Sequence, residues 1–227
     1  MDTVNIGLLG LGTVGGGTLQ LLKRHADAIE RRTGRRVQVR RVLVRDLAKP
    51  RPAEAADVAV TTDPDEILDD PAIHIVLELV GGCEPTRAWM LRAIAAGKHV
   101  ITANKALIAQ HGNEIFAAAD RHGVIVAFEA AVGGGSPIIK AIREALAGNR
   151  IESVSGIVNG TTNYILTEMR DRGLGFSEAL AQAQALGYAE ADPSFDIDGI
   201  DAAHKLAILA AIAFGTPLAF AGVATEG

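Results

Sequence analysis

The stretch VNIGLLGLGTVGGG (residues 4–17) sets the expectation for the fold. Its apolar start predicts a β-strand, and Gly10, Gly12 and Gly15 then form the pattern G-x-G-x-x-G at the start of a helix. There Gly10 permits a tight turn, Gly12 lets backbone approach a pyrophosphate, and Gly15 allows close packing of helix on strand. The helix N-terminus, at Thr13 and Val14, would face the phosphates. The alternative is a glycine turn in an α/β protein that binds no cofactor.

The sequence after this turn alternates short apolar runs with longer helical patterns up to about residue 130. Strands separated by helices predict a parallel sheet with right-handed crossovers, and the glycine pattern makes a Rossmann-type doubly wound α/β fold the expected architecture. The expected strands cover 4–10, 37–44, 72–80, 99–103 and 124–130, and the expected helices cover 13–31, 86–97 and 113–123.

The alternation of short apolar runs with helical patterns ends at GGGSP (133–137), where we expect a boundary between two domains. A dinucleotide-binding domain (1–132) is expected to precede a second, α+β domain (133–227). The second domain is expected to contain helix 138–148, a strand and then a helix within 150–166, and helices 177–187 and 199–214. We expect this domain to be incomplete, because the chain stops just after an apolar segment.

Composition narrows the class of protein. The net charge of −5 gives no reason to expect nucleic acid or an anionic membrane as a partner. A single cysteine, Cys83, excludes an intrachain disulfide and fits a reducing, cytoplasmic location; a reactive thiol is the less favoured interpretation. The uncharged segment 206–225 has the length of a membrane span, but Gly215-Thr216-Pro217 interrupts it. A buried helix, a break and a second buried segment are therefore expected.

The end of the second strand bears on cofactor choice. An acidic residue there would bind the ribose 2′-hydroxyl of NAD, whereas an arginine would accommodate the 2′-phosphate of NADP. Both Arg45 and Asp46 are present, and Lys49 and Arg51 add positive charge nearby. We expect NADP, with NAD as the alternative.

Three further polar groups are candidates for binding. Thr102, Asn104 and Lys105 follow a strand, where Lys105 could hold a carboxylate or phosphate, or simply cap a turn. Glu129, beside a glycine cluster, could hold a monovalent cation together with backbone carbonyls, although a hinge is the simpler interpretation. The last group precedes a helix, which it could cap or extend with ligand contacts: Asn159, Thr161, Thr162 and Asn163.

The stretch AEADPSFDIDGIDAAHK (189–205) collects five carboxylates and ends on a lysine. Asp201 and Lys205 are spaced i, i+4 and would share one face of a helix. They could form a surface ion pair, or Lys205 could be a proton donor with a tuned pKa. An EF-hand is rejected, because Asp196-x-Asp198-Gly199 lacks the third ligand position and the final glutamate.

The motifs GLGTVGGG, ELVGG, TANKALIA, FEAAVGGGSPII, NGTTNYIL and ALGYAEADPSFDIDGIDAAHKLAIL occur in the order and spacing of the homoserine dehydrogenases, which the whole chain resembles. The resemblance implies reversible NAD(P)H-dependent reduction of L-aspartate 4-semialdehyde to L-homoserine, in the biosynthesis of threonine, methionine and isoleucine. Aspartate-semialdehyde dehydrogenase shares this substrate, but Cys83 does not sit in the setting of its catalytic cysteine. Members of the family continue beyond the equivalent of Gly227, so a truncated, catalytically silent cofactor-binding chain is the alternative function.

The resemblance also implies roles for individual residues. Lys205 would be the general acid, Asp201 would orient it or a water, and Glu190 would bind the substrate α-ammonium group. Lys105 would lie near substrate and nicotinamide, and Thr162 and Asp196 near the substrate. A sodium site would comprise Glu129 and the carbonyls of Val132, Gly134 and Ser136. A homodimer or higher homo-oligomer is implied, and Asp198 is expected to cap the last helix.

Overall fold

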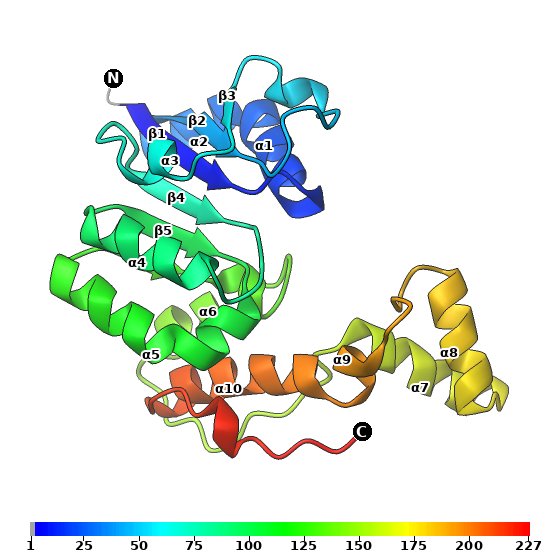
Figure 1. The fold of residues 1–227 in the computed structure, drawn as a ribbon. Coiled ribbons are helices and arrows are strands. Elements are labelled where there is room, and N and C mark those ends of the chain that lie inside the picture. The colour runs from blue at the N-terminus through cyan, green and yellow to red at the C-terminus, as the bar shows by residue number, and fades with distance from the viewer. Residues whose placement is uncertain (1–2) are drawn as a thin grey trace. The chain divides into compact units, whose positions relative to one another are not determined.

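The computed structural model describes residues 3–227, which divide into two compact units (Figure 1). The first unit ends at Ala131 and the second runs from Val132 to Gly227. The sequence placed this boundary one residue later, after residue 132.

The first unit is built on a parallel six-stranded sheet with the strand order β3-β2-β1-β4-β5-β6. The order reverses between β1 and β4, which creates the switch point where α/β sheets bind ligands. The Rossmann-type fold is therefore confirmed, with β3 as a strand that the sequence did not signal. The strands are β1 (Thr3–Leu9), β2 (Arg36–Leu43), β3 (Ala59–Thr61), β4 (Ile75–Glu78), β5 (His99–Thr102) and β6 (Val126–Ala127).

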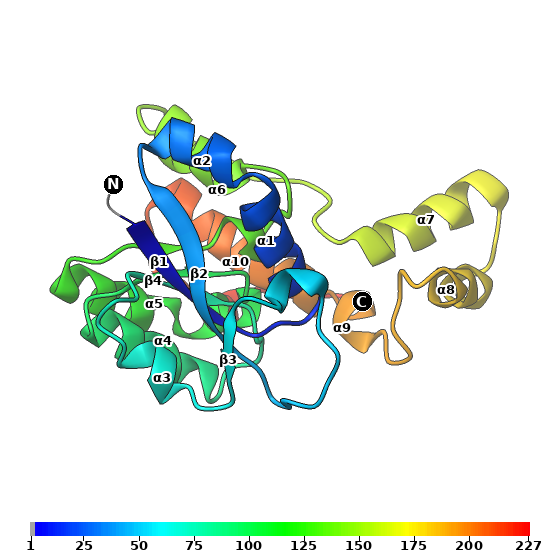
Figure 2. The same ribbon diagram turned by 90° about the horizontal axis from the view of Figure 1, so that it is seen from above.

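Helices cover both faces of this sheet. Figure 2 shows α1 and α2 on one side and α3, α4 and α5 on the other. The helices are α1 (Thr13–Arg24), α2 (Ala26–Thr33), α3 (Asp65–Leu68), α4 (Thr86–Ala95) and α5 (Lys105–His122). The helix expected over 13–31 is broken at His25, which leaves helical geometry (φ −108°). Helix α5 begins well before its expected start at residue 113, because the side chain of Asn104 caps it by accepting a hydrogen bond from Leu107 N at 3.1 Å.

The core of this unit lies where helices meet the central strands. Strands β1 and β4 are covered on both faces, and their apolar runs are accordingly buried without alternation. The largest fully buried side chains here are Leu8, Leu9, Leu19, Ile67, Leu68, Ile73, Met90, Ile94, Leu107, Ile108 and Ile115. This packing fixes the strand ends from which the functional loops leave.

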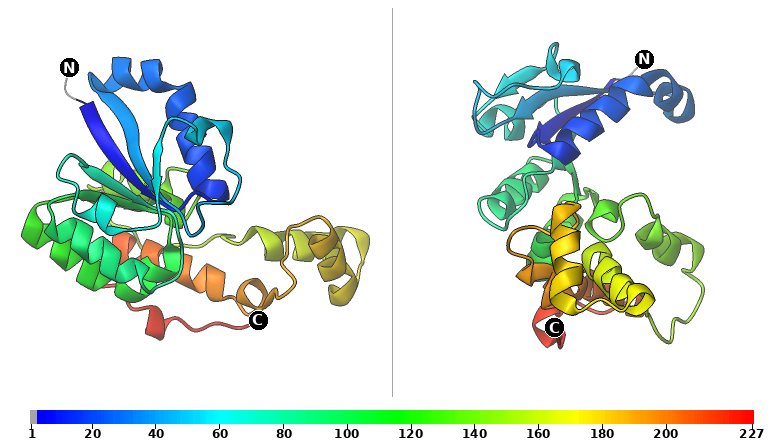
Figure 3. Two further views of the ribbon diagram at one scale, coloured as in Figure 1. Left: turned by 45° about the horizontal axis from the view of Figure 1, so that its top comes forward. Right: turned by 90° about the vertical axis from the view of Figure 1, so that its right-hand side faces the viewer.

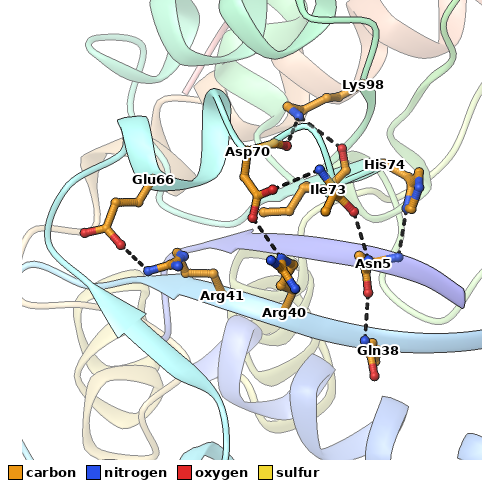
Figure 4. Close-up of polar contacts among 10 residues, drawn as sticks. Asn5, Gln38, Arg40, Arg41, Glu66, Asp70, Ile73, His74 and Lys98 are labelled. Carbon is orange, nitrogen blue, oxygen red and sulfur yellow. Dashed lines mark hydrogen bonds and ion pairs between the residues drawn. The ribbon is translucent and has the colours of Figure 1, made fainter.

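Polar side chains gather at the amino edge of the sheet (Figure 4). Arg40 Nε donates to Asp70 Oδ2 at 2.8 Å, and Lys98 Nζ donates to the carbonyl oxygens of Asp70 at 2.6 Å and Ile73 at 3.0 Å. Asn5 Nδ2 donates to Ala72 O at 2.9 Å. These bonds tie the loop between α3 and β4 to β1, to β2 and to the residue that precedes β5.

The second unit is helical in the part of the chain that the structure describes. It contains α6 (Ile138–Lys140), a π-helical turn (Ala141–Ala145), α7 (Gly160–Arg172), α8 (Phe176–Ala185), α9 (Ser194–Ile197) and α10 (Ile200–Phe214). Helices α7 and α8 pack side by side (Figure 3) around a small core of Ile165, Ala179, Ala183 and Ala189. Helix α10 buries one face, on which Asp201 and Ile208 both lie.

Two expectations for this unit are wrong. The strand expected within residues 150–158 is absent, because these residues make no backbone–backbone hydrogen bond within residues 3–227, and a strand requires a neighbour. The second apolar segment, after Gly215, is largely exposed rather than buried; Phe220 is one residue that finds an aromatic partner there, with its ring 4.3 Å from that of His204. Within residues 3–227, no helix combines the length and apolarity needed to cross a membrane.

Candidate active site

The glycine turn joins β1 to α1 with very little space. Gly10 has φ +98°, and a Cβ on it would lie 2.9 Å from the Leu79 carbonyl oxygen. A Cβ on Gly15 would lie 2.1 Å from the Gly10 carbonyl oxygen, whereas one on Gly12 would meet nothing within 4 Å. Glycine is thus required for the turn and the packing, and Gly12 leaves room in front of the helix N-terminus. The turn fits a bound pyrophosphate.

A cavity of about 500 Å³ opens at this turn, entirely within the first unit. Its walls come from the carboxyl ends of β1, β2 and β4, the loops that follow these strands and β3, and the first turn of α4. The lining residues are Gly10, Leu11, Gly12, Leu43, Val44, Arg45, Asp46, Lys49, Pro50, Arg51, Thr62, Pro64, Leu79, Val80 and Trp89. Its position at the switch point, its largely apolar walls and its basic side chains suit a dinucleotide.

The acidic and basic residues after β2 are used differently. Asp46 Oδ1 accepts a hydrogen bond from Ala48 N at 2.8 Å, and the Asp46 carbonyl accepts one from Arg51 Nη2 at 2.9 Å. Asp46 therefore stabilises its own loop. Arg45 is exposed and makes no hydrogen bond or ion pair within residues 3–227, so its guanidinium can turn to a ligand.

The polar residues after β5 form a network with a residue that sequence reasoning did not single out, Glu78. Thr102 Oγ1 donates to Glu78 Oε2 at 2.5 Å and accepts from Asn104 N at 2.9 Å. Asn104 Nδ2 donates to the Gly82 carbonyl at 2.6 Å. Lys105 is the first residue of α5, and the capping role considered for it belongs to Asn104. A cation at a helix N-terminus lies against the helix dipole, so a bound anion would compensate it.

Cys83 lies beside this network. Its Sγ is 3.7 Å from Gln110 Oε1. Burial, and secondarily the charge of Glu84, raises the pKa of the Cys83 thiol. A raised pKa reduces the thiolate fraction at neutral pH, which argues against a nucleophilic role.

In the second unit, Lys205 and Asp201 form a largely buried ion pair on α10. Lys205 Nζ donates to Asp201 Oδ2 at 2.8 Å, and the side chains are 17% and 6% exposed. Lys205 Nζ also donates to the Val158 carbonyl at 2.6 Å. Since an ammonium group has three N–H bonds, these contacts aim the head group and leave one N–H for a ligand. The surface-pair interpretation does not fit this burial.

Asn159 joins the acidic stretch to the start of α7. Its Nδ2 donates to Asp196 Oδ1 at 2.7 Å and to Asp201 Oδ2 at 2.9 Å. Its Oδ1 accepts from Thr162 N at 2.8 Å, as the helix cap, and from Thr162 Oγ1 at 3.0 Å. The structure thus brings together four residues that the sequence selected: Thr162, Asp196, Asp201 and Lys205.

The other members of the acidic stretch have separate roles. Glu190 is exposed, and its carbonyl accepts from Gln184 Nε2 at 3.1 Å. Asp192 Oδ1 accepts from Ser194 N at 3.1 Å, and bonds to Ser194 lower the pKa of Asp192. The expectation that Asp198 caps the last helix is wrong. The N-cap of α10 is Gly199, in a left-handed conformation (φ 76°) that glycine adopts readily.

The predicted sodium ligands fall on both sides of the unit boundary. Glu129 lies in the short 3-10 turn (Glu129–Ala131) that ends the first unit, whereas Val132, Gly134 and Ser136 belong to the second. The Ser136 carbonyl accepts from Ile138 N at 2.8 Å, which occupies one of its two lone pairs. Among residues 3–227, no group of three or more His, Cys, Asp or Glu side chains could hold a metal ion. One carboxylate with several carbonyls is a donor set that suits a hard monovalent cation.

Comparisons with known proteins give one consistent family. The model described as "Homoserine dehydrogenase, NAD binding domain" matches residues 10–129, and the model described as "Homoserine dehydrogenase" matches residues 137–227. The chain is 56% identical to the homoserine dehydrogenase of Pseudomonas aeruginosa over 228 aligned residues, which cover 100% of this chain and 52% of that protein. It spans about half the length of the curated relatives it matches.

Two solved structures are also similar. A homoserine dehydrogenase from Thiobacillus denitrificans superposes with a TM-score of 0.96 at 60% identity, covering 100% of this chain and 52% of that one. A hyperthermophilic archaeal homoserine dehydrogenase in complex with NADPH gives a TM-score of 0.83 at 29% identity, covering 98% of this chain and 75% of that one.

Proposed function

The chain belongs to the homoserine dehydrogenase family, and from that premise we propose that the protein carrying it reduces L-aspartate 4-semialdehyde to L-homoserine, reversibly, with NADPH. The observation that carries the proposal is the buried Lys205–Asp201 pair. Asp201 Oδ2 and the Val158 carbonyl orient the ammonium group, and one N–H is left for the substrate.

The proposed chemistry follows from the charge that develops on the aldehyde. The bound nicotinamide cofactor supplies the hydride. As the carbonyl carbon accepts it, negative charge builds on the oxygen, where the Lys205 ammonium stabilises that charge and donates a proton. Asp201 keeps Lys205 in place through the hydrogen bond from Lys205 Nζ to Asp201 Oδ2.

Substrate recognition is proposed to use groups of both signs. The amino-acid end of the substrate carries an ammonium and a carboxylate, so the site needs an anion and hydrogen-bond donors. Glu190, with an exposed carboxylate, is proposed for the ammonium. Lys105 and Thr162 are proposed for the carboxylate, and Asp196 is proposed to lie near the substrate through its bond to Asn159.

The main test is NADPH oxidation with aspartate semialdehyde by the complete protein and its Lys205→Ala variant. We expect the variant to lose about 10²-fold or more in kcat, the scale of general acid catalysis. Lys140→Ala is the matched control, because Lys140 belongs to an exposed i, i+4 pair in the same unit. Near-normal turnover in the Lys205 variant would remove it from this role. A wild-type protein that binds NADPH but does not oxidise it would favour the alternative, a silent cofactor-binding chain.

NADPH is proposed over NADH because of the residues after β2. Arg45 is exposed at the cavity, Lys49 and Arg51 add positive charge, and the Asp46 carboxylate is engaged in its own turn. Arg45→Ala should raise KM for NADPH much more than KM for NADH, with Arg31→Ala, on the exposed end of α2, as control. Equal changes for the two cofactors would rule out a contact with the 2′-phosphate.

Three further features are proposed for the complete protein. A sodium ion bound by Glu129 and the carbonyls of Val132, Gly134 and Ser136 would be tested by replacing Na⁺ with a bulky organic cation in the assay.

A homodimer or higher oligomer is supported by the unpaired segment 150–158, in which Ile157 is 78% exposed, and light scattering would give the mass. A cytoplasmic location is proposed from the single cysteine, and cell fractionation would check it.

A further inference from the structure

Glu78 is a completely buried carboxylate at the carboxyl end of β4, with an exposed fraction of 0%. Its Oε1 accepts from Val80 N at 2.9 Å and Gly81 N at 3.1 Å, and its Oε2 accepts from Thr102 Oγ1 at 2.5 Å. Glu78 forms no ion pair in the described chain. All three partners are neutral donors, and both oxygens of Glu78 act as acceptors.

Burying a carboxylate without a cation is unfavourable unless its oxygens are fully hydrogen-bonded. Leucine or valine at the end of a buried strand would avoid this cost, so the core alone does not explain Glu78. The parallel register pairs Glu78 directly with Thr102, and the carboxylate thereby links the ends of two neighbouring strands. Further hydrogen bonds connect Glu78 and Thr102 to the loop after β4 and to the start of α5.

One set of bonds holds the loop after β4. Val80 donates its N–H to Glu78 Oε1, and it lines the cofactor cavity together with Leu79. The Gly82 carbonyl of the same loop accepts from Asn104 Nδ2 at 2.6 Å. The loop is therefore held from the Glu78 side and from the α5 side.

The second set of bonds holds the start of α5. Thr102 Oγ1, which donates to Glu78, accepts from Asn104 N at 2.9 Å, and Asn104 Oδ1 caps α5 through Leu107 N. Lys105 follows Asn104 directly as the first residue of the helix. A continuous series of hydrogen bonds therefore runs from Glu78 to the backbone that presents Lys105.

We propose that Glu78 is a positioning residue: it sets the loop that lines the cofactor cavity and the helix start that presents Lys105, without itself contacting substrate. The part that concerns Lys105 rests on the proposed function, whereas the part that concerns the cavity requires only that the first unit binds the dinucleotide.

The test uses Glu78→Gln and Thr102→Val in the complete protein. Glutamine retains an acceptor for the Val80 and Gly81 N–H groups but turns an NH₂ toward Thr102, which reverses that hydrogen bond. Valine keeps the shape of Thr102 without the hydroxyl. We expect each variant to lose about ten- to a hundredfold in kcat/KM, the scale of small misplacements of reacting groups. Thr102→Ser, which keeps the hydroxyl, should restore most of this loss. Glu114→Gln at an exposed carboxylate of the same unit is the matched control.

Cofactor binding is measured separately by fluorescence. Trp89 is the only tryptophan of the chain and lines the cavity, so energy transfer from Trp89 to NADPH reports the Kd without turnover. We expect the Kd for NADPH to rise several-fold in both variants.

The possible outcomes separate this inference from the proposed function. Wild-type protein that binds NADPH but does not reduce the aldehyde overturns the proposed function and leaves the Kd comparison valid. Variants with wild-type kcat/KM and wild-type Kd overturn the positioning role. Variants that lose only thermal or urea stability, with unchanged constants for the folded fraction, also overturn it. Loss in Thr102→Val without recovery in Thr102→Ser does the same.

Discussion

Two lysines lie on either side of strand β5, and they differ in position, in burial and in the groups around them. Lys98 precedes the strand at the amino edge of the sheet, is 3% exposed, and donates to the carbonyls of Asp70 and Ile73 (Figure 4). Burial lowers its pKa, although the nearby aspartates Asp70 and Asp69 oppose that change. Lys105 follows the strand at the carboxyl edge, is only partly buried, and opens a helix whose dipole disfavours a cation.

The difference separates a structural edge from a functional one. At the amino edge, the side chains and loop carbonyls bond to one another, so the edge is closed. At the carboxyl edge, the loops surround a cavity, and charged groups occupy positions that do not favour stability. This is the division expected of a parallel sheet, where ligands bind beyond the carboxyl ends of the strands.

The largest difference between the edges should appear when each of the two lysines is replaced by methionine in a separate variant. Lys98→Met should lower the free energy of unfolding by about 2–4 kcal/mol, because two carbonyls lose their buried donor. The Kd for NADPH should not change. Lys105→Met should destabilise the protein less than Lys98→Met does and reduce kcat/KM at least about tenfold. Urea unfolding and steady-state kinetics measure both, and equal destabilisation by the two variants would contradict the distinction between the edges.

Local patterns were sufficient to predict the functional edge in outline. The glycine turn and the buried central strands are local features, since the spacing of glycines and the continuity of apolar residues carry them. The i, i+4 spacing likewise placed Asp201 beside Lys205. Helix α5 was predicted too short, because Asn104 was considered as a ligand rather than as a cap.

Contacts between distant residues could not be predicted in this way. Glu78 meets Thr102 only because the register of β4 and β5 aligns them, and Lys98 finds its carbonyls on a loop that precedes β4. Glu78 lies within the expected strand 72–80, and nothing in the local sequence indicates a partner on the next strand. Segment 150–158 was expected to contain a strand, but whether it forms one depends on a neighbour that its own residues do not specify.

Replacing one asparagine at each edge of the sheet should give a smaller difference between the edges. Asn104→Ala removes the cap of α5 and the donor to Gly82 O, and should cost about 1–2 kcal/mol while raising KM for NADPH. Asn5→Ala removes the donor to Ala72 O, and should cost about 1 kcal/mol without changing KM. Asn104→Asp is an informative control, because it keeps the capping acceptor and loses only the donor. If Asn104→Asp behaves as wild type in both assays, the bond to Gly82 O does not shape the cavity.

The smallest effect concerns acid stability at the amino edge. The hydrogen bond from Arg40, and then the backbone N–H of Ala72, lowers the pKa of Asp70. A carboxylate with a depressed folded-state pKa contributes stability that is fully present above its unfolded pKa, about 3.9, and is lost as the pH falls through the folded value. Arg40→Gln removes the larger cause. The variant should therefore be less stable than wild type above about pH 5, and the difference should vanish in stronger acid.

The difference in stability between wild type and Arg40→Gln should be below about 1 kcal/mol, since the Arg40 side chain is 45% exposed. Urea midpoints measured across the acidic range would show the two curves converging. A difference that stayed constant into acid would mean that Arg40 stabilises this edge by packing rather than by charge. NADPH affinity should be the same in both proteins at neutral pH, because none of the groups that change lies at the carboxyl edge.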